Sequence, residues 1–265
     1  MTPKLLLIGK KSFISAILYK FLKKKINIKK ISYEDFEKLN DSFFEKFTHI
    51  CNCSIKKEYQ NQKYLAKNDI DLKIINRIKK NKKIKYIFLS SRKIYFPKNN
   101  IKENSKLKPS CNYSKNKLIT ENKILKKIPN NHLILRISNI IGKINTGQSS
   151  RKVSNTFIKN FYKFKKKKKV FYENFYKDFL SEKQFSLIFN KILKKNLKGI
   201  YNVSLGKKIF ISEILFALNK NKISNKFQKS NYVSNDNFYL NNRKLMKKIK
   251  IKITKKDLLK YCYNM

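Results

Sequence analysis

Short apolar runs alternate with stretches of helical spacing in the first half of the chain. Residues 4–9 (KLLLIG) form a continuous apolar run that ends in glycine, and residues 12–24 then carry apolar side chains every three or four positions. The first pattern is typical of a buried strand, and the second predicts an amphipathic helix. The chain therefore opens with a strand, a tight turn and a helix.

The same alternation continues as far as Gly142. Further apolar runs predict strands at 27–33, 48–53, 85–91 and 132–138, and the main stretches of helical spacing between them are 59–81 and 110–127. Buried strands that alternate with helices are typical of a parallel sheet covered on both faces, with right-handed crossovers. We therefore predict an α/β fold with a doubly wound parallel sheet.

The pattern becomes less regular after Gly142. We predict in order a helix, an extended segment, a helix, a strand and a last helix, at 153–164, 169–175, 181–195, 199–206 and from 254 onward. The helices at 181 and 254 each begin with a hydroxyl residue followed three positions later by Gln or Asp, the spacing of a capping box. We expect one large domain over residues 1–150, to which the strand near 199–206 returns, and a smaller lobe over residues 151–265.

The chain carries a large positive charge that is spread along its length. It has 65 Lys and Arg against 16 Asp and Glu, a formal net charge of +49. Such a charge attracts nucleic acid or acidic membranes. However, Lys, Asn, Ile, Phe and Tyr are abundant while Gly, Pro and Trp are scarce, which is the bias of AT-rich codons, and the one basic block is at 163–170. We ascribe the charge to this bias and do not expect nucleic acid as a partner.

The cysteines argue against a metal-binding protein, and the apolar segments argue against a membrane-spanning one. Cys51, Cys53, Cys111 and Cys262 have neither the spacing of a zinc site nor a nearby His, so we expect reduced thiols and no metal. No segment approaches the roughly 20 apolar residues of a membrane span, and no cleavage site follows the apolar start. We therefore expect a cytoplasmic protein with no membrane partner.

A tyrosine is followed four positions later by a lysine at four places, so this spacing alone does not identify a catalytic pair. The pairs are Tyr19/Lys23, Tyr59/Lys63, Tyr113/Lys117 and Tyr162/Lys166. At this spacing both side chains lie on one helix face, where an ammonium group favours the phenolate. Only Tyr113 follows a predicted strand that ends in Ser-Ser, comes just after a proline that opens a helix, and precedes LILRISNIIG.

Seven segments, taken in order, resemble the extended short-chain dehydrogenase/reductase family, which includes nucleotide-sugar epimerases, dehydratases and reductases. They are KLLLIGKKSFIS, ICNCS, FLSSRKIY, PSCNYSKNKLITE, LILRISNIIG, KGIYNVSLG and LNNRKLMKKIKIK. No single segment is specific, but together they extend over nearly the whole chain. The resemblance implies a Rossmann fold with a small C-terminal lobe that binds substrate.

The resemblance also implies roles for individual residues. Tyr113 would be the catalytic acid or base, Lys117 would tune it and hold the nicotinamide ribose, and Ser91 would position the reacting oxygen of the substrate. The residues expected to bind NAD or NADP are Gly9, Ser12, Phe13, Ile14 and Asn52, with Tyr113 and Lys117. Asn139 and Asn155 would contact the nucleotide-sugar substrate.

The chain departs from the family pattern at three places. Ser12 and Ser15 stand where the first turn has glycines, and the Ser12 side chain either obstructs the cofactor phosphate or donates a hydrogen bond to it. The second strand ends at Ser32 rather than in an acid, which leaves both NAD and NADP open. Ser91 is followed by two basic residues instead of the Asp-Glu pair of the 4,6-dehydratases, which disfavours a dehydratase.

We therefore expect an NAD(P)-dependent nucleotide-sugar epimerase or ketoreductase that serves polysaccharide-precursor synthesis. One alternative is a degenerate, non-catalytic member of the fold that binds RNA through its basic surface; Ser12 and the charge favour it, whereas Ser91, Tyr113 and Lys117 oppose it. A non-catalytic sugar-nucleotide sensor is a third reading. The resemblance is also compatible with a homodimer.

Overall fold

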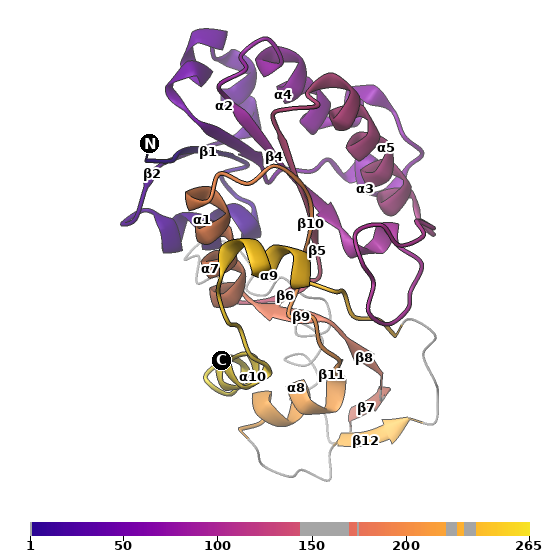
Figure 1. The fold of residues 1–265 in the computed structure, drawn as a ribbon. Coiled ribbons are helices and arrows are strands. Elements are labelled where there is room, and N and C mark those ends of the chain that lie inside the picture. Colours follow the sequence, from indigo (N-terminus) through magenta and orange to yellow (C-terminus); the bar gives the residue numbers. More distant parts are fainter. Residues whose placement is uncertain (1, 144–169, 174, 221–226, 231–236) are drawn as a thin grey trace. The chain divides into compact units, whose positions relative to one another are not determined.

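A computed structural model describes residues 2–143, 170–173, 175–220, 227–230 and 237–265. The chain forms two compact units, and each is described by itself (Figure 1). The first unit consists of Met1–Phe96, Asn104–Ile137 and Ile188–Tyr201, and the second of Pro97–Glu103, Ser138–Leu187 and Asn202–Met265.

A six-stranded sheet forms the centre of the first unit. Its strands lie in the order β10 (Gly199–Val203), β5 (His132–Ile137), β4 (Lys85–Ser91), β3 (His49–Asn52), β1 (Lys4–Ile8) and β2 (Asn27–Ile31). The pairings from β2 through β5 are all parallel. Successive strands are joined through helices, so the predicted doubly wound Rossmann-like α/β fold is confirmed.

Helices pack on both sides of this sheet. They are α1 (Phe13–Leu22), α2 (Tyr33–Lys38), α3 (Lys57–Asn61), α4 (Ile70–Ile78) and α5 (Asn112–Lys127), with short 3-10 helices at Asp41–Lys46, Ala66–Asn68 and Arg92–Ile94. In Figure 1, α2, α4 and α5 lie on one side of the strands and α1 lies on the other.

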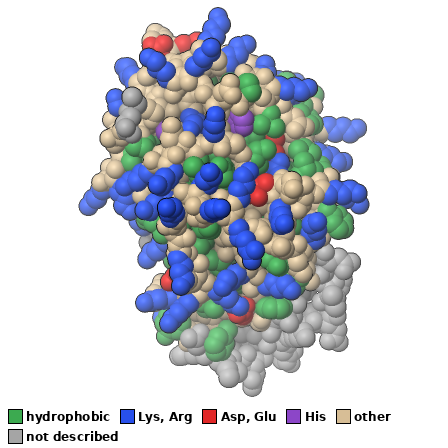
Figure 2. Space-filling view, viewed as in Figure 1, with side chains coloured by type: hydrophobic (Ala, Val, Ile, Leu, Met, Phe, Trp, Pro, Cys, Tyr) green, Lys and Arg blue, Asp and Glu red, His purple; other side chains and the backbone are tan. Residues whose placement is uncertain are grey.

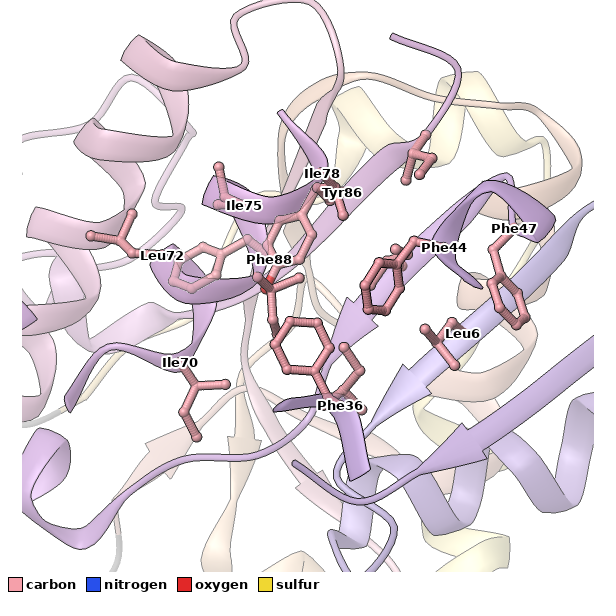
Figure 3. Packing of buried hydrophobic residues seen from close by; sticks show 14 of the residues in the cluster. Leu6, Phe36, Phe44, Phe47, Ile70, Leu72, Ile75, Ile78, Tyr86 and Phe88 are labelled. Carbon is pink, nitrogen blue, oxygen red and sulfur yellow. The ribbon is translucent and has the colours of Figure 1, made fainter. Parts of the chain in front are cut away.

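The core explains why the strands read as continuous apolar runs. On β1, Leu6 and Ile8 belong to a buried cluster with the aromatic side chains of α2 and β4, including Phe36 and Phe88 (Figure 3). Leu5 and Leu7 point the other way and are equally buried. Because helices cover both faces, neither face of the strand can be polar.

The helix predicted over residues 59–81 is divided in the structure. It consists of α3, a 3-10 turn and α4, and the last of these begins only after Asp69. The Asp69 carboxylate accepts a hydrogen bond from the Leu72 amide at 3.1 Å and so caps α4. A side-chain cap in the middle of a helical pattern starts a new helix, which the apolar spacing alone does not reveal.

The second unit contains three two-stranded sheets and several helices. The pairs are β6 (Asn139–Ile141) with β9 (Phe179–Ser181), β8 (Tyr176–Lys177) with β11 (Ile209–Phe210), and β7 (Val170–Glu173) with β12 (Phe227–Ser230). Its helices are α8 (Ile211–Leu218), α9 (Arg243–Ile249) and α10 (Lys255–Tyr263), and α7 (Glu182–Lys194) begins in this unit and belongs to the first from Ile188 onward. The helix predicted at 153–164 lies outside the described residues.

Both capping boxes predicted in this half of the sequence are confirmed. Ser181 and Gln184 exchange hydrogen bonds at the start of α7, with the Ser181 amide 3.0 Å from Gln184 Oε1. Thr254 and Asp257 do the same at the start of α10. Among the helices that the structure describes, none is long and apolar enough to cross a membrane.

Candidate active site

The carboxyl ends of three neighbouring strands meet at one edge of the sheet in the first unit. Gly9 follows β1, Asn52 is the last residue of β3, and Ser91 is the last residue of β4. The register pairs Ile8 with Asn52, so the end of β1 lies directly beside the end of β3. In open parallel sheets this edge is where ligands bind.

The turn after β1 requires glycine. Gly9 has a φ of +113°, and a Cβ added there would lie 2.7 Å from Ser54 Oγ and 2.8 Å from the Ser54 backbone nitrogen. The positive φ is unfavourable for any L side chain, and the short distances to Ser54 leave no space for one. The β1–α1 turn is therefore packed directly against the backbone that leaves β3.

Ser12 sits at the start of α1 without capping it. Its φ of −72° is an ordinary extended conformation, so a side chain is tolerated there without strain. The Ser12 hydroxyl makes no capping hydrogen bond to the helix, so the first-turn amides of Phe13 and Ile14 have no side-chain cap. An uncapped helix N-terminus next to a tight glycine turn fits a dinucleotide phosphate, with the hydroxyl available as a further donor.

Ser15 stands where the family pattern has a third glycine. The residue is fully buried on α1, and its hydroxyl has no hydrogen-bond partner in the described part of the chain. Its small size is therefore accommodated by the packing of α1, at the cost of an unpaired polar group.

Asn52 is held by its neighbours rather than open to solvent. It is buried; its amide nitrogen donates to the Ser54 carbonyl at 3.1 Å, and its oxygen accepts from the Ser54 amide at 2.9 Å. These two hydrogen bonds shape the backbone that Gly9 packs against. A contact between Asn52 and a cofactor stays a prediction.

The three predicted catalytic residues all belong to the first unit. The Ser91 hydroxyl, at the end of β4, accepts a hydrogen bond from the Lys93 amide at 3.2 Å. Tyr113 is the second residue of α5 and is half-buried, and Lys117 lies one turn further along the same helix. The spacing predicted for this pair is therefore realised on a regular helix.

Burial distinguishes Lys117 from the other lysines. It is 6% exposed, and it is the only lysine that is buried among the residues that the structure describes. In the competing pairs, Lys23 and Lys63 are exposed, and Lys166 lies outside the described residues. Lysine is rarely buried without a partner, because removing an ammonium group from water is costly.

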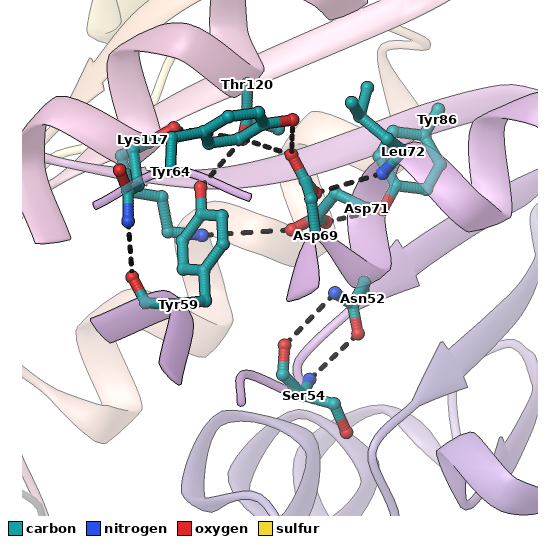
Figure 4. Close-up of polar contacts among 11 residues, drawn as sticks. Asn52, Ser54, Tyr59, Tyr64, Asp69, Asp71, Leu72, Tyr86, Lys117 and Thr120 are labelled. Carbon is teal, nitrogen blue, oxygen red and sulfur yellow. Dashed lines mark hydrogen bonds and ion pairs between the residues drawn. The ribbon is translucent and has the colours of Figure 1, made fainter. Parts of the chain in front are cut away.

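A buried carboxylate on α4 compensates this charge (Figure 4). Lys117 Nζ lies 4.0 Å from Asp71 Oδ2, and Tyr86 Oη donates to Asp71 Oδ1 at 2.6 Å. Burial raises the pKa of Asp71 to about 6, while Lys117 opposes that rise. Asp71 could not be picked out from the sequence, because an acid in the first turn of a helix is ordinarily exposed to water and interacts with the helix dipole.

A second buried acid ties three helices of this unit together. Asp69 Oδ2 accepts from the Thr120 hydroxyl at 2.6 Å and from Tyr64 Oη at 2.9 Å. Because the Thr120 proton is used in this bond, the Tyr59 hydroxyl donates to Thr120 Oγ1 at 2.7 Å. These bonds connect α3, α4 and α5 beneath Lys117 and fix the helix that carries the candidate pair.

Arg136 has a structural place on β5. Its Nη2 lies 2.7 Å from Glu121 Oε2, and its Nη1 donates to Tyr95 Oη at 2.8 Å. Arg136 and Glu121 are both buried. The ion pair joins α5 to β5, which gives Arg136 a structural part in the fold.

The two asparagines predicted to bind substrate do not belong to the first unit as described. Asn139 begins β6 in the second unit, where its side chain donates to the Asp178 carbonyl at 3.0 Å. Asn155 lies outside the described residues. The structure therefore places the predicted cofactor and catalytic residues in one unit, and the substrate contacts stay predictions.

Asp178 itself organises the second unit. Its buried carboxylate accepts hydrogen bonds from the backbone amides of Leu205, Gly206 and Leu240, at 2.9, 3.0 and 3.1 Å. These amides belong to segments that are far apart in sequence. The residue is therefore structural, although its burial and acidity alone would make it a catalytic candidate.

A hollow of about 610 Å³ occurs at the opposite edge of the sheet in the first unit. Its lining includes His49 and Lys85, which begin β3 and β4, together with four other lysines at 82, 83, 194 and 198. Burial and the nearby Lys85 lower the pKa of His49 to about 4, so this histidine is neutral near pH 7. The hollow contains none of the predicted site residues and is not the candidate active site.

Basic side chains are numerous on the surface. On the face shown in Figure 2, Lys and Arg are spread over the surface rather than gathered in one patch. Within the described residues, no group of three or more His, Cys, Asp or Glu side chains could hold a metal ion.

Comparison with known proteins agrees with this fold. Residues 12–203, most of the chain, match the NAD dependent epimerase/dehydratase family. No curated protein is significantly similar to the chain in sequence.

Solved structures share the fold over nearly the full length. The UDP-N-acetylglucosamine 4-epimerase of Methanobrevibacter ruminantium M1, in complex with UDP-N-acetylmuramic acid, is 16% identical with a TM-score of 0.77; 99% of this chain and 96% of that chain are covered. RMD from Pseudomonas aeruginosa, complexed with NADPH, is 15% identical with a TM-score of 0.78, over 99% and 98% of the two chains. The Bordetella bronchiseptica enzyme WbmG, in complex with NAD, is 17% identical with a TM-score of 0.77, over 100% and 94%.

Proposed function

This chain belongs to the NAD dependent epimerase/dehydratase family, and we propose that it acts as an NAD(P)-dependent nucleotide-sugar epimerase or ketoreductase. The observation that carries the proposal is the burial of Lys117, one helical turn after Tyr113. The chain has 65 Lys and Arg. Among the residues that the structure describes, the one lysine that is buried is the lysine that the proposed chemistry requires. A composition-driven lysine would remain on the surface.

The proposed chemistry is a proton transfer by Tyr113. A phenol is a poor base at neutral pH, and a neighbouring ammonium group makes its deprotonated form accessible. Tyr113 would take a proton from a sugar hydroxyl, or give one to a ketone, while Ser91 hydrogen-bonds the same oxygen and positions it. The bound nicotinamide would accept or supply the hydride.

The proposed cofactor site is the edge formed by Gly9, Ser12 and the start of α1. The amides of Phe13 and Ile14 and the Ser12 hydroxyl would meet the phosphates, while Asn52 and Lys117 would lie toward the nicotinamide ribose. Of the acids after β2, Asp35 is engaged in a capping box with Ser32. Both NAD and NADP therefore remain candidates.

The proposed substrate is a nucleotide sugar, contacted by Asn139 and Asn155. The structural relative from M. ruminantium was solved with UDP-N-acetylmuramic acid, which supports this substrate class. Arg92, which follows Ser91, is buried at the start of a 3-10 helix and supplies no acid for the elimination of water. An epimerase or a ketoreductase is therefore favoured over a dehydratase. A cytoplasmic homodimer is part of the same proposal.

Replacement of one tyrosine at a time tests the proposal. Tyr113→Phe should lower kcat on an active nucleotide sugar by at least about 100-fold, because the proton donor and acceptor is removed. The cofactor dissociation constant should change by less than about twofold, since the ring remains. Tyr19→Phe is a matched control, because Tyr19 has a lysine at the same spacing on α1 and should leave kcat unchanged.

Equal activity of Tyr113→Phe and the wild type would contradict the assigned role. If the folded wild type binds neither NAD nor NADP, but binds RNA near physiological salt, then the RNA-binding alternative replaces the enzyme. Binding to RNA that disappears steeply as salt rises would be the ordinary behaviour of a lysine-rich surface.

A further inference from the structure

We propose that Asp71 is a positioning residue for the Tyr113–Lys117 pair: its carboxylate holds the Lys117 ammonium group and sets the pH range in which the pair can work. The inference rests on the proposed function. It adds a residue from α4 that touches neither substrate nor cofactor in the proposed mechanism, and that acts only through Lys117.

The geometry of the pair leaves the hydrogen-bond donors of Lys117 available. Lys117 Nζ lies 4.0 Å from Asp71 Oδ2, which is close enough for charge compensation but longer than a hydrogen bond (Figure 4). The ammonium group makes no hydrogen bond to any residue in the described part of the chain. Its N–H groups therefore remain available for other partners, while its charge is balanced by a carboxylate.

Aromatic rings complete the surroundings of this ammonium group. Lys117 Nζ lies 4.4 Å from the centroid of the Phe88 ring and 5.6 Å from that of Tyr59. Such contacts favour the cation, but they do not replace the water that a buried ammonium has lost. Asp71 is the one acidic group in ion-pair distance of Lys117 in the described structure, so it is the group that compensates this buried charge.

Asp71 is itself fixed from two sides. Tyr86 Oη donates to Oδ1 at 2.6 Å, which leaves Oδ2 directed toward Lys117. The Asn52 side chain, which is hydrogen-bonded to Ser54, also acts to lower the pKa of Asp71. Both residues stand on strands, Tyr86 on β4 and Asn52 on β3. The carboxylate is therefore positioned by the rigid part of the unit and cannot turn away from Lys117 without breaking these contacts.

The titratable groups around Asp71 come from six segments. They are Asp69 at the start of α4, Lys117 on α5, Tyr86 on β4, Cys51 on β3, Tyr59 on α3 and Tyr64 in the segment after α3. Burial raises the pKa of Tyr59, Tyr64, Tyr86 and Cys51, so these groups are neutral near pH 7. At neutral pH the charges in direct opposition are those of Asp71 and Lys117.

The simpler reading is an ion pair that serves only the fold. Buried ion pairs contribute little net stability, and well-packed apolar residues often replace them without loss. That reading and ours differ in one measurable respect. Removal of a purely structural carboxylate lowers the amount of active protein, whereas removal of a charge beside Lys117 displaces the pH dependence of the reaction.

The sign of the displacement follows from electrostatics. A nearby negative charge makes every neighbouring group release its proton less readily. When that charge is removed, the groups beside it release a proton more readily. Both limbs of the pH–rate profile should therefore move in the same direction, toward lower pH.

The experiment compares Asp71→Asn with the wild type from pH 5 to 10. Asn preserves the shape of the side chain but carries no charge. We expect both limbs of the kcat/KM profile to move to lower pH, by about one unit for a group as close to the charge as Lys117 Nζ, which lies 4.0 Å from Asp71 Oδ2. The pH above which NADH affinity declines, measured by fluorescence titration, should move by a similar amount, because Lys117 would hold the nicotinamide ribose.

Two further variants separate charge from packing. Asp69→Asn is the matched control: it removes the charge of another buried carboxylate at the start of α4, one that is not within ion-pair distance of Lys117. It should lower stability but move the limbs by less than half as much. Asp71→Glu restores the charge and should return the limbs to their wild-type positions, even if kcat is lower.

The outcomes are distinguishable. If Asp71→Asn lowers the maximum of the kcat/KM profile but leaves both of its limbs at their wild-type pH, the inference is overturned and the proposed function is left intact. If Asp71→Asn does not fold, Tyr86→Phe decides the matter, because it withdraws a hydrogen bond that favours the ionised Asp71 and should move the acid limb in the same direction by a smaller amount. An unmoved acid limb in Tyr86→Phe would then overturn the inference. A wild type that neither turns over nucleotide sugars nor binds cofactor would overturn the proposed function itself.

Discussion

Replacement of Gly9 by alanine tests the tight turn on which the cofactor site depends. Two costs add up at this position. Its φ of +113° is strained for any L side chain, which costs about 1–3 kcal/mol. The new Cβ would also lie 2.8 Å from the Ser54 nitrogen and 3.0 Å from the Cys53 carbonyl carbon. Both are backbone atoms, so relief requires β3 and the turn to separate, which costs about 1–3 kcal/mol more.

Gly199 offers a control that contains only the first of these costs. It has a φ of +96°, but an added Cβ would meet no atom within 4 Å. Gly199→Ala should therefore lower the free energy of unfolding by about 1–3 kcal/mol, and Gly9→Ala by about 2 kcal/mol more than Gly199→Ala. Because the chain has no Trp, urea unfolding is best followed by circular dichroism.

The same pair of variants also reports on function. Gly9→Ala should weaken NAD or NADP binding as well as stability, because the turn moves relative to the start of α1, whereas Gly199→Ala should not change the affinity. If Gly9→Ala cost no more stability than Gly199→Ala, the close approach of the turn to Ser54 would be refuted.

Three further predictions concern the same unit. Ser12→Ala should change the free energy of unfolding by less than about 0.5 kcal/mol, since the hydroxyl does not cap α1. If that hydroxyl donates to a cofactor phosphate, the same variant should weaken cofactor binding, measured by calorimetry, about fivefold to tenfold. Stronger binding would mean that the Ser12 side chain obstructs the phosphate. Arg136→Met should cost about 3–5 kcal/mol in urea unfolding, because Glu121 is left buried and unpaired, and addition of Glu121→Leu should recover most of it. Burial raises the pKa of Asp71 in the folded state to about 6, above its usual value of 3.8, so between pH 4 and 6 the folded state binds a proton that the unfolded state has lost. The contribution of Asp71 to the free energy of unfolding therefore falls by on the order of 3 kcal/mol as pH rises through that range. Asp71→Asn should remove that part of the pH dependence of stability, as measured by urea unfolding.

The sheet and its working edge could be predicted because both depend on local sequence. Strands buried on both faces must be continuously apolar, as at Leu5 to Ile8, and they recur with the helices between them. Gly9, which follows β1, and Ser91, the last residue of β4, then share an edge because neighbouring parallel strands end on the same side. Tyr113 was placed by its position after such a strand, and not by its spacing from a lysine.

The partner of Lys117 could not be predicted, because it depends on packing between helices. Asp71 precedes Lys117 by 46 positions, and the two meet only because α4 and α5 pack on the same side of the sheet. In sequence, Asp69 and Asp71 look alike, as two acids at the start of one helix. In the structure one caps α4 and accepts the Thr120 hydroxyl, whereas the other compensates the buried ammonium. The division of residues 59–81 into separate helices has the same origin.

Calorimetric titration of the folded protein with NAD and with NADP tests the central claim most directly. The account predicts saturable binding of at least one of them, at one molecule per chain. It also predicts that Lys117→Met weakens this binding by at least about tenfold, the loss of a charge-assisted contact to the cofactor. Folded protein that binds neither dinucleotide would contradict the account.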